Sequence, residues 1–132
     1  MKFIIHVDGG SRGNPGPAAA AAVITSPDGD LLDEAGEKIG QATNNVAEYK
    51  AVLLGLKRAA ALGAKEVEVV NDSELVAKQI NGQYKVKHVD MKPLHAEAIR
   101  QLRGFDKWTI RSVPRAQNKE ADALVNKTLD GS

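Results

Sequence analysis

The stretch that decides the fold is Phe3-Ile-Ile-His-Val-Asp-Gly-Gly-Ser-Arg-Gly-Asn-Pro-Gly-Pro17. It begins with a mostly apolar, β-rich run, and the aspartate, glycines and prolines that follow are strong breakers of regular structure. Further along, 18–25 and 31–39 flank Ser26-Pro-Asp-Gly-Asp30, the pattern of a β-hairpin with an Asp-Gly tip. We therefore expect a first strand at 3–7 and a meander of three antiparallel strands.

Beyond the hairpin, the apolar residues change to the spacing of an amphipathic helix. Tyr49, Val52 and Leu56 predict a helix over 45–62, and Gly63 is suited to end it. The remaining pattern predicts a strand at 67–70, a helix that ends near Gly82, a helix from Pro93 to Gly104, a strand at 108–113 and a last helix after Asn118, with Phe3, Tyr49, Phe105 and Trp108 in the core. The predicted fold is α/β, a five-stranded mixed sheet flanked by about four helices in a single domain over 1–132.

Composition excludes several classes of protein. The 132 residues are 42% hydrophobic and 27% charged, as in soluble globular domains. The lack of cysteine excludes disulfides and thiolate zinc sites. The apolar run near the N-terminus is too short for a signal peptide, and 18–24 is too short to cross a bilayer. We expect a cytoplasmic monomer without membrane contact.

The distribution of charge says more than its total. A net charge of +1 is weak support for a polyanionic partner, because nucleic-acid binders usually carry a basic patch. Two groups of basic residues are candidates for phosphate contacts, with ordinary solvated surface as the alternative. They are Lys85, Lys87, His88 and Lys92, and Lys107, Arg111, Arg115 and Lys119.

Four acidic residues lie where strands are predicted to end or helices to begin. Asp8 ends the first strand and Asp72 follows the fourth, while Glu48 and Asp122 lie in the first turns of the long and last helices. Sites in α/β folds form at the carboxyl ends of strands. Clustered carboxylates repel one another unless a cation is present, and oxygen ligands favour Mg²⁺ or Mn²⁺. If the four acids converge, they suit two-metal phosphodiester hydrolysis.

Each acid also has a purely structural interpretation. Asp8 and the two glycines after it fit a turn, and Glu48 fits a capping box with Asn45. Asp72 fits an N-cap, and Asp122 fits an acid favoured by the helix dipole. Spacing alone leaves both interpretations open, because convergence of the four side chains depends on the fold.

The sequence resembles type 1 ribonuclease H in four segments, in order and spacing. They are Asp8-Gly-Gly-Ser-Arg-Gly-Asn-Pro-Gly-Pro17, Thr43-Asn-Asn-Val-Ala-Glu48, Asn71-Asp-Ser73 and Asn118-Lys-Glu-Ala-Asp122. The resemblance covers nearly the whole chain. It implies a ribonuclease H-like fold in which the first three strands are antiparallel, strands four and five run parallel to strand one, and the four acids meet over the centre of the sheet.

The resemblance also implies an activity, namely endonucleolytic cleavage of the RNA strand of RNA/DNA hybrids to give 5′-phosphate products. Asp8 would bridge two Mg²⁺ ions, Glu48 and Asp72 would ligate one ion, and Asp122 would complete the other, with Mn²⁺ as a substitute. Contacts to 2′-hydroxyls distinguish RNA from DNA. The positions that match the family's substrate contacts are Gly9, Gly10, Ser11, Asn14, Thr43, Asn44 and Asn45. A turn for Asn14 and helix capping for Asn44 and Asn45 are the structural alternatives.

The sequence departs from the best-known bacterial members of this family at two places. Residues 82–93 are too short for the basic, Trp-containing protrusion of those members, and the loop before the last helix lacks their histidine. The chain is similar in this to the histidine-lacking, archaeal-like members. Arg115 is then a candidate to assist catalysis electrostatically, since arginine cannot shuttle protons, or it is a surface arginine.

Two rival functions remain. One is a nuclease of the same fold that also cuts double-stranded RNA. The other is a non-catalytic nucleic-acid-binding module, against which the four retained acids argue, because a pure binder gains nothing from anions placed beside phosphates.

Overall fold

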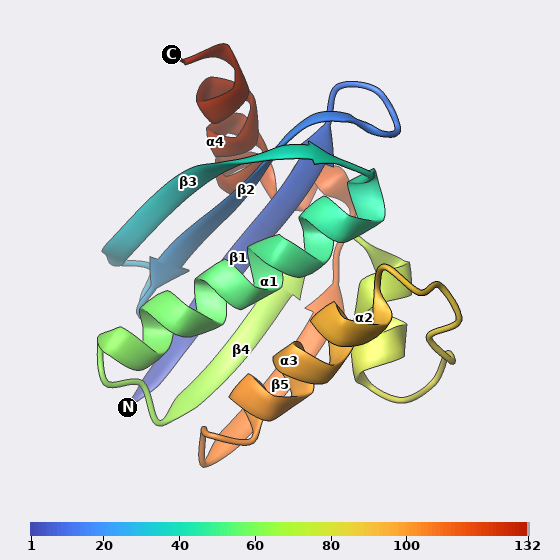
Figure 1. The fold of residues 1–132 in the computed structure, drawn as a ribbon. Helices are drawn as coiled ribbons and strands as arrows, with labels where there is room; N and C mark the ends of the chain where they lie inside the picture. The colour runs from blue at the N-terminus through green and yellow to red at the C-terminus, as the bar shows by residue number, and fades with distance from the viewer. Residues whose placement is uncertain (132) are drawn as a thin grey trace.

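A mixed β-sheet carries the structure, which is a computed structural model that describes residues 1–131. Within this span five strands form one sheet in the order β3-β2-β1-β4-β5. The elements are β1 (Lys2–Ser11), β2 (Gly16–Thr25), β3 (Leu31–Ala42), α1 (Asn44–Ala61), β4 (Glu66–Asn71), α2 (Glu74–Ile80), α3 (Lys92–Leu102), β5 (Lys107–Ser112), the 3₁₀ turn η1 (Arg115–Gln117) and α4 (Lys119–Asp130). Figure 1 shows their arrangement.

The sheet has the predicted topology. β1, β2 and β3 are antiparallel neighbours, β4 runs parallel to β1, and β5 runs parallel to β4. The hairpin between β2 and β3 turns at Gly29, whose φ of 93° suits glycine. The ribonuclease H-like fold class is therefore confirmed, with three antiparallel strands and two that add in parallel.

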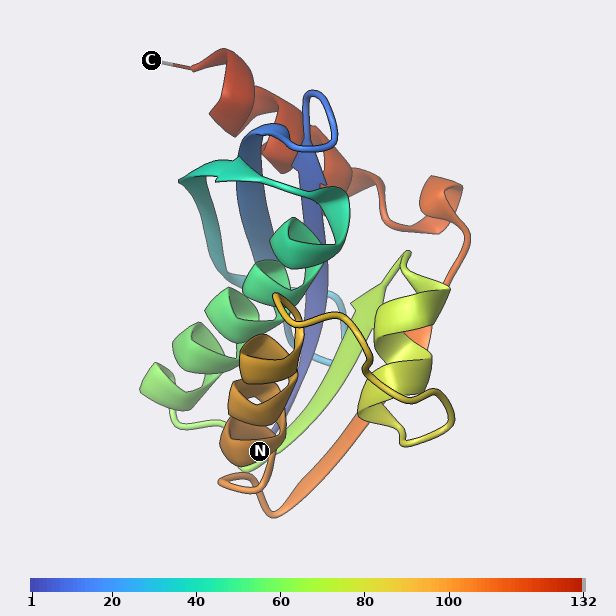
Figure 2. The ribbon, with the colours of Figure 1, turned by 45° about the vertical axis from the view of Figure 1, so that its right-hand side comes forward.

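The helices cover both faces of this sheet. Ala20, Ala22 and Ile24 of β2 lie in one core with Leu56 of α1, whereas Ala19 and Ala21 pack against Val125 of α4. Because successive side chains of a strand point to opposite faces, α1 and α4 lie on opposite sides of β2 (Figures 1 and 2). The small alanines let both helices approach the sheet closely.

β1 is longer than predicted. Two glycines, Gly9 and Gly55, allow α1 to pack closely against it. The strand continues through Gly9 and Gly10 because both pair with β2, so the predicted turn after Asp8 is wrong. A Cβ on Gly9 would lie 2.1 Å from the carbonyl oxygen of Ala47, and one on Gly55 would lie 2.6 Å from Ile5 Cγ2. α1 thus touches β1 beside Asp8 as well as further down the strand.

The aromatic residues are only partly as expected. Phe3 and Tyr49 are buried in the main core, whereas Phe105 and Trp108 are partly buried and pack against it from outside. Within residues 1–131, no helix is both long and apolar enough to span a membrane.

Candidate active site

The four predicted acids and Arg115 line one open cavity of about 440 Å³. Two parallel strands carry Asp8 and lead into Asp72, so the carboxyl ends of neighbouring strands meet at the same edge of the sheet. Glu48 comes from α1 and Asp122 from α4, the helices on the two faces. A larger cavity of about 850 Å³ lies between β3, α1 and α3 and contains none of these four acids.

The exact position of each acid removes three of the four structural interpretations. Thr43, not Asn45, caps α1, because its Oγ1 accepts from Val46 N at 3.2 Å. Glu48 therefore lies in the second turn of α1 rather than the first, and the capping-box interpretation is wrong. Ser73 caps α2, which removes the N-cap interpretation of Asp72. The turn interpretation of Asp8 fails because β1 continues past it.

Asp122 is the exception. It lies in the first turn of α4, where the helix dipole favours an acid, as predicted.

The electrostatics of the cluster are those of crowded anions. Burial, the charges of Asp72 and Asp122, and hydrogen bonding with both raise the pKa of Asp8 to about 8. Burial raises the pKa of Glu48 to about 7, although a hydrogen bond with Ser73 and the charge of Arg115 oppose this. Only 6% of Asp8 is exposed. Ionised carboxylates are therefore energetically unfavourable in this cavity, and a bound cation would stabilise them.

Arg115 is the cation that this cluster already contacts. Its Nη2 lies 3.2 Å from Asp122 Oδ1, and 77% of its side chain is exposed, against 28% for Asp122. The charge of Asp122 and its hydrogen bond raise the pKa of Arg115, with smaller contributions from Asp8 and Asp72. Arg115 is thus a surface arginine, as one interpretation held, and it lies at the cavity of the four acids, while its role stays a prediction.

Beside the acids, the end of β1 and the loop after it are hydrogen-bonded to the first residue of α1, and these segments carry predicted substrate contacts. Ser11 N donates to Asn44 Oδ1 at 2.8 Å, and Asn44 N donates to Asn14 Oδ1 at 3.1 Å. The Oδ1 atoms of Asn14 and Asn44 thus each accept a backbone hydrogen bond. Their Nδ2 groups remain as donors for other partners. We call Ser11, Asn14 and Asn44 the amide bracket.

The other predicted substrate positions lie near this bracket. Thr43 caps α1, so one acceptor position of its hydroxyl is occupied. Asn45 is exposed in the first turn of α1, and capping explains neither Asn44 nor Asn45. Gly9 is buried against α1, and Gly10 lies near Val125 of α4.

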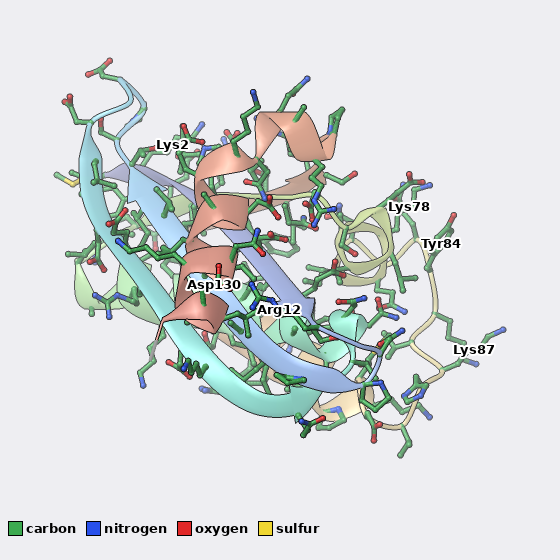
Figure 3. All side chains as sticks on the ribbon, turned by 90° about the horizontal axis from the view of Figure 1, so that it is seen from above. Lys2, Arg12, Lys78, Tyr84, Lys87 and Asp130 are labelled. Atoms are coloured by element: carbon green, nitrogen blue, oxygen red, sulfur yellow. The ribbon has the colours of Figure 1, made fainter. Side chains whose placement is uncertain are left out.

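The two basic groups of the sequence are arranged differently from each other. Arg111 Nε lies 3.2 Å from Glu68 Oε2 of the neighbouring strand, and Lys107 lies at the opposite end of β5 from the site. The second group is therefore not one basic patch. By contrast, Lys85 and Lys87 are both exposed on the connection between α2 and α3, which we call the basic loop (81–91) (Figure 3).

Sequence reasoning missed two residues of the site. The Ser73 side chain opposes the rise in the pKa of Glu48, and Asn118 is fully buried, with its Nδ2 donating to Val7 O at 2.8 Å. Asn118 is at the N-cap position of α4 as predicted, but its side chain makes no capping hydrogen bond. Only its place in the quoted fourth segment, four residues before Asp122, could have signalled it.

The donor set of the cavity fits Mg²⁺ or Mn²⁺. It offers carboxylate oxygens without sulfur, and burial together with the charges of Asp72 and Asp122 raises the pKa of Asp8, which a bound cation would oppose. Among the described side chains, no three His, Asp or Glu residues already form a compact ligand group. The acids thus surround a shared space and would have to close on an ion.

Comparisons with known proteins agree with this fold. The chain matches the family model described as reverse transcriptase-like over residues 6–128. It superposes with a TM-score of 0.98 on the crystal structure of RNase H1 from the archaeon Halobacterium salinarum, at 45% identity and with full coverage of both chains. The TM-score is 0.92, at 41% identity, with LC11-RNase H1 in complex with an RNA/DNA hybrid, covering 97% of this chain and 96% of that one. The arrangement of the sheet and the helices is thus that of ribonuclease H structures.

Sequence relatives lead to the same family. The ribonuclease HI of Halobacterium salinarum is 47% identical over 95% of this chain, and a ribonuclease H of Sulfurovum is 30% identical over 98% of this chain and 91% of its own length. The chain belongs to the ribonuclease H family. It spans 63% of the Halobacterium protein, and 36% of a Mycobacterium tuberculosis bifunctional protein to which it is 46% identical.

Proposed function

We propose that the chain is a divalent-metal-dependent ribonuclease H that cuts the RNA strand of RNA/DNA hybrids. The observation that carries the proposal is the gathering of Asp8, Glu48, Asp72 and Asp122 around one open cavity beside the amide bracket. Family membership and the likeness to a ribonuclease H1 that binds a hybrid support it.

The four acids would hold two Mg²⁺ ions, with Mn²⁺ as a substitute. Bound there, such ions lower the pKa of water and stabilise charge on the reacting phosphate and the leaving 3′ oxygen. Asp8 is the natural shared ligand, because its carboxylate interacts with both Asp72 and Asp122. Glu48 would add a carboxylate from the second turn of α1, whose ionised form Ser73 favours.

The amide bracket gives the site its preference for RNA. With their oxygens bonded to backbone N–H groups, Asn14 and Asn44 present Nδ2 donors in fixed directions. A 2′-hydroxyl can accept such a hydrogen bond, and DNA has no group at that position. Gly9, Gly10, Asn45 and Thr43 lie on the same two segments and would contribute further contacts to the RNA strand.

Arg115 would assist the reaction through its charge. It lies at the rim of the cavity, exposed and paired with Asp122, so it can move towards a phosphate without losing a buried partner. Because guanidinium stays protonated, it would stabilise the phosphate or product and would transfer no proton. The wider expectations of a cytoplasmic monomer and a single domain are part of this proposal.

The experiment compares cleavage of RNA/DNA, RNA/RNA and DNA/DNA duplexes of one sequence, with Mg²⁺ and with Mn²⁺. We expect metal-dependent cleavage of the hybrid's RNA strand, with 5′-phosphate ends, and at least about 10³-fold loss in Asp8→Asn and Asp72→Asn. Equal cutting of double-stranded RNA would replace the proposal with a broader nuclease. Binding of the hybrid without cleavage would make the chain a binding module.

A further inference from the structure

A buried asparagine joins the two elements that carry Asp8 and Asp122. Asn118 is 0% exposed, and its Nδ2 donates to Val7 O at 2.8 Å. Its backbone oxygen accepts from Asp122 N at 3.1 Å. One residue is therefore bonded to the peptide that precedes Asp8 and to the backbone of Asp122.

The bond to Val7 forms where the sheet opens. β1 pairs with β4 only as far as His6 and Val70, whereas its pairing with β2 continues to Ser11. Val7 lies directly past the last pair with β4, so β4 no longer offers its carbonyl a partner, and the Asn118 amide takes that place. Asp8 follows at the next position, where the gap between the strands becomes the cavity.

Apart from the bond to Val7, the Asn118 side chain makes no hydrogen bond within residues 1–131 that would stabilise the fold. Its Oδ1 is buried without a hydrogen-bond partner among the described residues, and the side chain does not cap α4. The amide cannot be turned round to improve this, because Val7 O only accepts hydrogen bonds. An unpaired buried acceptor is unfavourable. The donor to Val7 is thus the interaction for which this residue type is needed.

We propose that Asn118 is a positioning residue, which fixes Asp8 relative to Asp122 so that both carboxylates can share a cation. The inference rests on the proposed function and deepens it. Groups that do not touch a metal themselves often orient its ligands, and their loss typically costs about 10–100-fold in metal affinity or activity. Asn118 would act in this way through Val7 and through the first hydrogen bond of α4.

The test uses Asn118→Ala, and Asn118→Leu to keep the space filled with a side chain of similar size. Asn81→Ala is the matched control, because Asn81 Nδ2 likewise donates to a strand carbonyl, that of Ile110 at 3.0 Å, and none of the four acids follows either residue. The measurements are Mg²⁺ and Mn²⁺ binding by calorimetry without substrate, the Mg²⁺ concentration for half-maximal cleavage, the KM for the hybrid, and the thermal midpoint in EDTA.

In both Asn118 variants we expect the Mg²⁺ dissociation constant and the half-maximal Mg²⁺ concentration to rise about 10–100-fold. The KM for the hybrid at saturating Mg²⁺ should stay within about twofold, because the fully buried Asn118 offers substrate no accessible surface. Asn81→Ala should leave Mg²⁺ binding unchanged, and because Asn81 is exposed it should lower the thermal midpoint less than the Asn118 variants do.

Three results would overturn the inference. They are an unchanged Mg²⁺ affinity in a folded Asn118 variant, a loss of Mg²⁺ affinity in Asn81→Ala that matches its loss of stability, and failure of both Asn118 variants to fold. The proposed function fails separately, if wild-type protein binds Mg²⁺ but leaves the hybrid intact. In that case calorimetry alone still decides the role of Asn118.

Discussion

The carboxylate site and the basic loop (81–91) are built in opposite ways. Asp8 is 6% exposed, Asn118 is fully buried, and Gly9 brings the backbone of α1 into contact with β1. In the basic loop, Tyr84 is 48% exposed and Val89 73% exposed. The metal-binding candidates thus depend on backbone packing, whereas the loop exposes most of its residues to solvent and meets the core through Val86 and Met91.

The contacts within and around the loop are those of a surface. Lys78 Nζ lies 3.3 Å from the Tyr84 hydroxyl and 4.9 Å from the centre of its ring; both residues are labelled in Figure 3. His88 Nδ1 lies 3.9 Å from Asp90 Oδ2. Such exposed interactions contribute little to stability. We therefore expect changes at the carboxylate site to affect folding and metal binding, and changes in the loop to affect the affinity for nucleic acid and its salt dependence.

We expect the largest effect on stability from adding one methyl group to Gly9, beside the buried carboxylate site. Gly9→Ala would place Cβ 2.1 Å from the Ala47 carbonyl oxygen, which is backbone and cannot turn away. We expect the free energy of unfolding to fall by about 3 kcal/mol or more. Urea unfolding monitored by circular dichroism measures this.

Gly10→Ala is the matched control for that substitution. Its Cβ would lie 3.6 Å from Val125 Cγ1, an ordinary contact, and Gly10 lies in the same strand. Its stability should stay within about 1 kcal/mol of wild type. Equal stabilities of the two variants would show that α1 is not held against β1 at Gly9.

The next effect is a dependence of stability on pH in metal-free protein. The pKa of Asp8 is raised from 3.8 to about 8, by burial first and then by Asp72 and Asp122. The folded state therefore binds more protons than the unfolded state between these values, and stability present at low pH is lost as the pH rises towards 8. Relative to Asp8→Asn, wild type in EDTA should lose about 1–3 kcal/mol between pH 5 and pH 9.

The comparison with Asp8→Asn isolates this group, because both proteins share all other titrating residues. Glu48, with its pKa raised to about 7, contributes in the same direction to both. Mg²⁺ should stabilise wild type most at pH 9, where the acids are ionised. Parallel stability curves for the two proteins in EDTA would contradict the crowded-anion interpretation.

Arg115 lies between the two kinds of region, since it is exposed but paired with a site acid. Arg115→Ala should lower kcat for the hybrid about tenfold, which is about 1.4 kcal/mol, with KM within about threefold. Arg100→Ala is the control, because Arg100 is 72% exposed and pairs with Glu97 on α3. Neither change should alter the free energy of unfolding by more than about 0.5–1 kcal/mol. An unchanged kcat in Arg115→Ala would make its pairing with Asp122 incidental.

The sequence predicted the elements that depend on local patterns and missed the features that depend on contacts between residues far apart in the chain. Helical spacing around Val52 and the Asp-Gly tip at Gly29 predicted α1 and the hairpin, because both signals are local. The turn after Asp8 was predicted wrongly, because pairing with β2 keeps Gly9 and Gly10 extended. The tendency of glycine to form turns is a local preference and does not take pairing with a neighbouring strand into account.

The site shows the same limit. The spacing of the four acids was also compatible with purely structural roles. Only the resemblance of four segments, in order, to type 1 ribonuclease H predicted that they form one site. The position of Glu48 in the second turn depended on whether Thr43 or Asn45 caps α1, which single-residue preferences do not resolve. Asn118 was predicted as a cap, and its actual bond exists only because β4 separates from β1 beyond His6. Which of these side chains bind metal or hybrid stays a prediction.

The smallest expected effect tests the exposed side of the comparison. Lys85 and Lys87 are exposed neighbours of Tyr84 and carry positive charge that a nucleic-acid backbone can meet. Removing both, as Lys85→Ala with Lys87→Ala, should raise KM for the hybrid about threefold and leave kcat and the thermal midpoint unchanged. The slope of log KM against log salt concentration should decrease by about 1 for each lysine that contacts a phosphate.

The matched control removes two exposed lysines, Lys57 near the C-terminal end of α1 and Lys65 on the connection to β4, as Lys57→Ala with Lys65→Ala. The two double variants lose the same net charge, so an effect of total charge alone would change both KM values equally. A larger KM and a shallower salt slope only in the loop variant would place phosphate contacts on the basic loop. If the loop variant also lost kcat at saturating hybrid, the loop would be positioning the RNA strand at the acids, and the separation of the two regions would not hold.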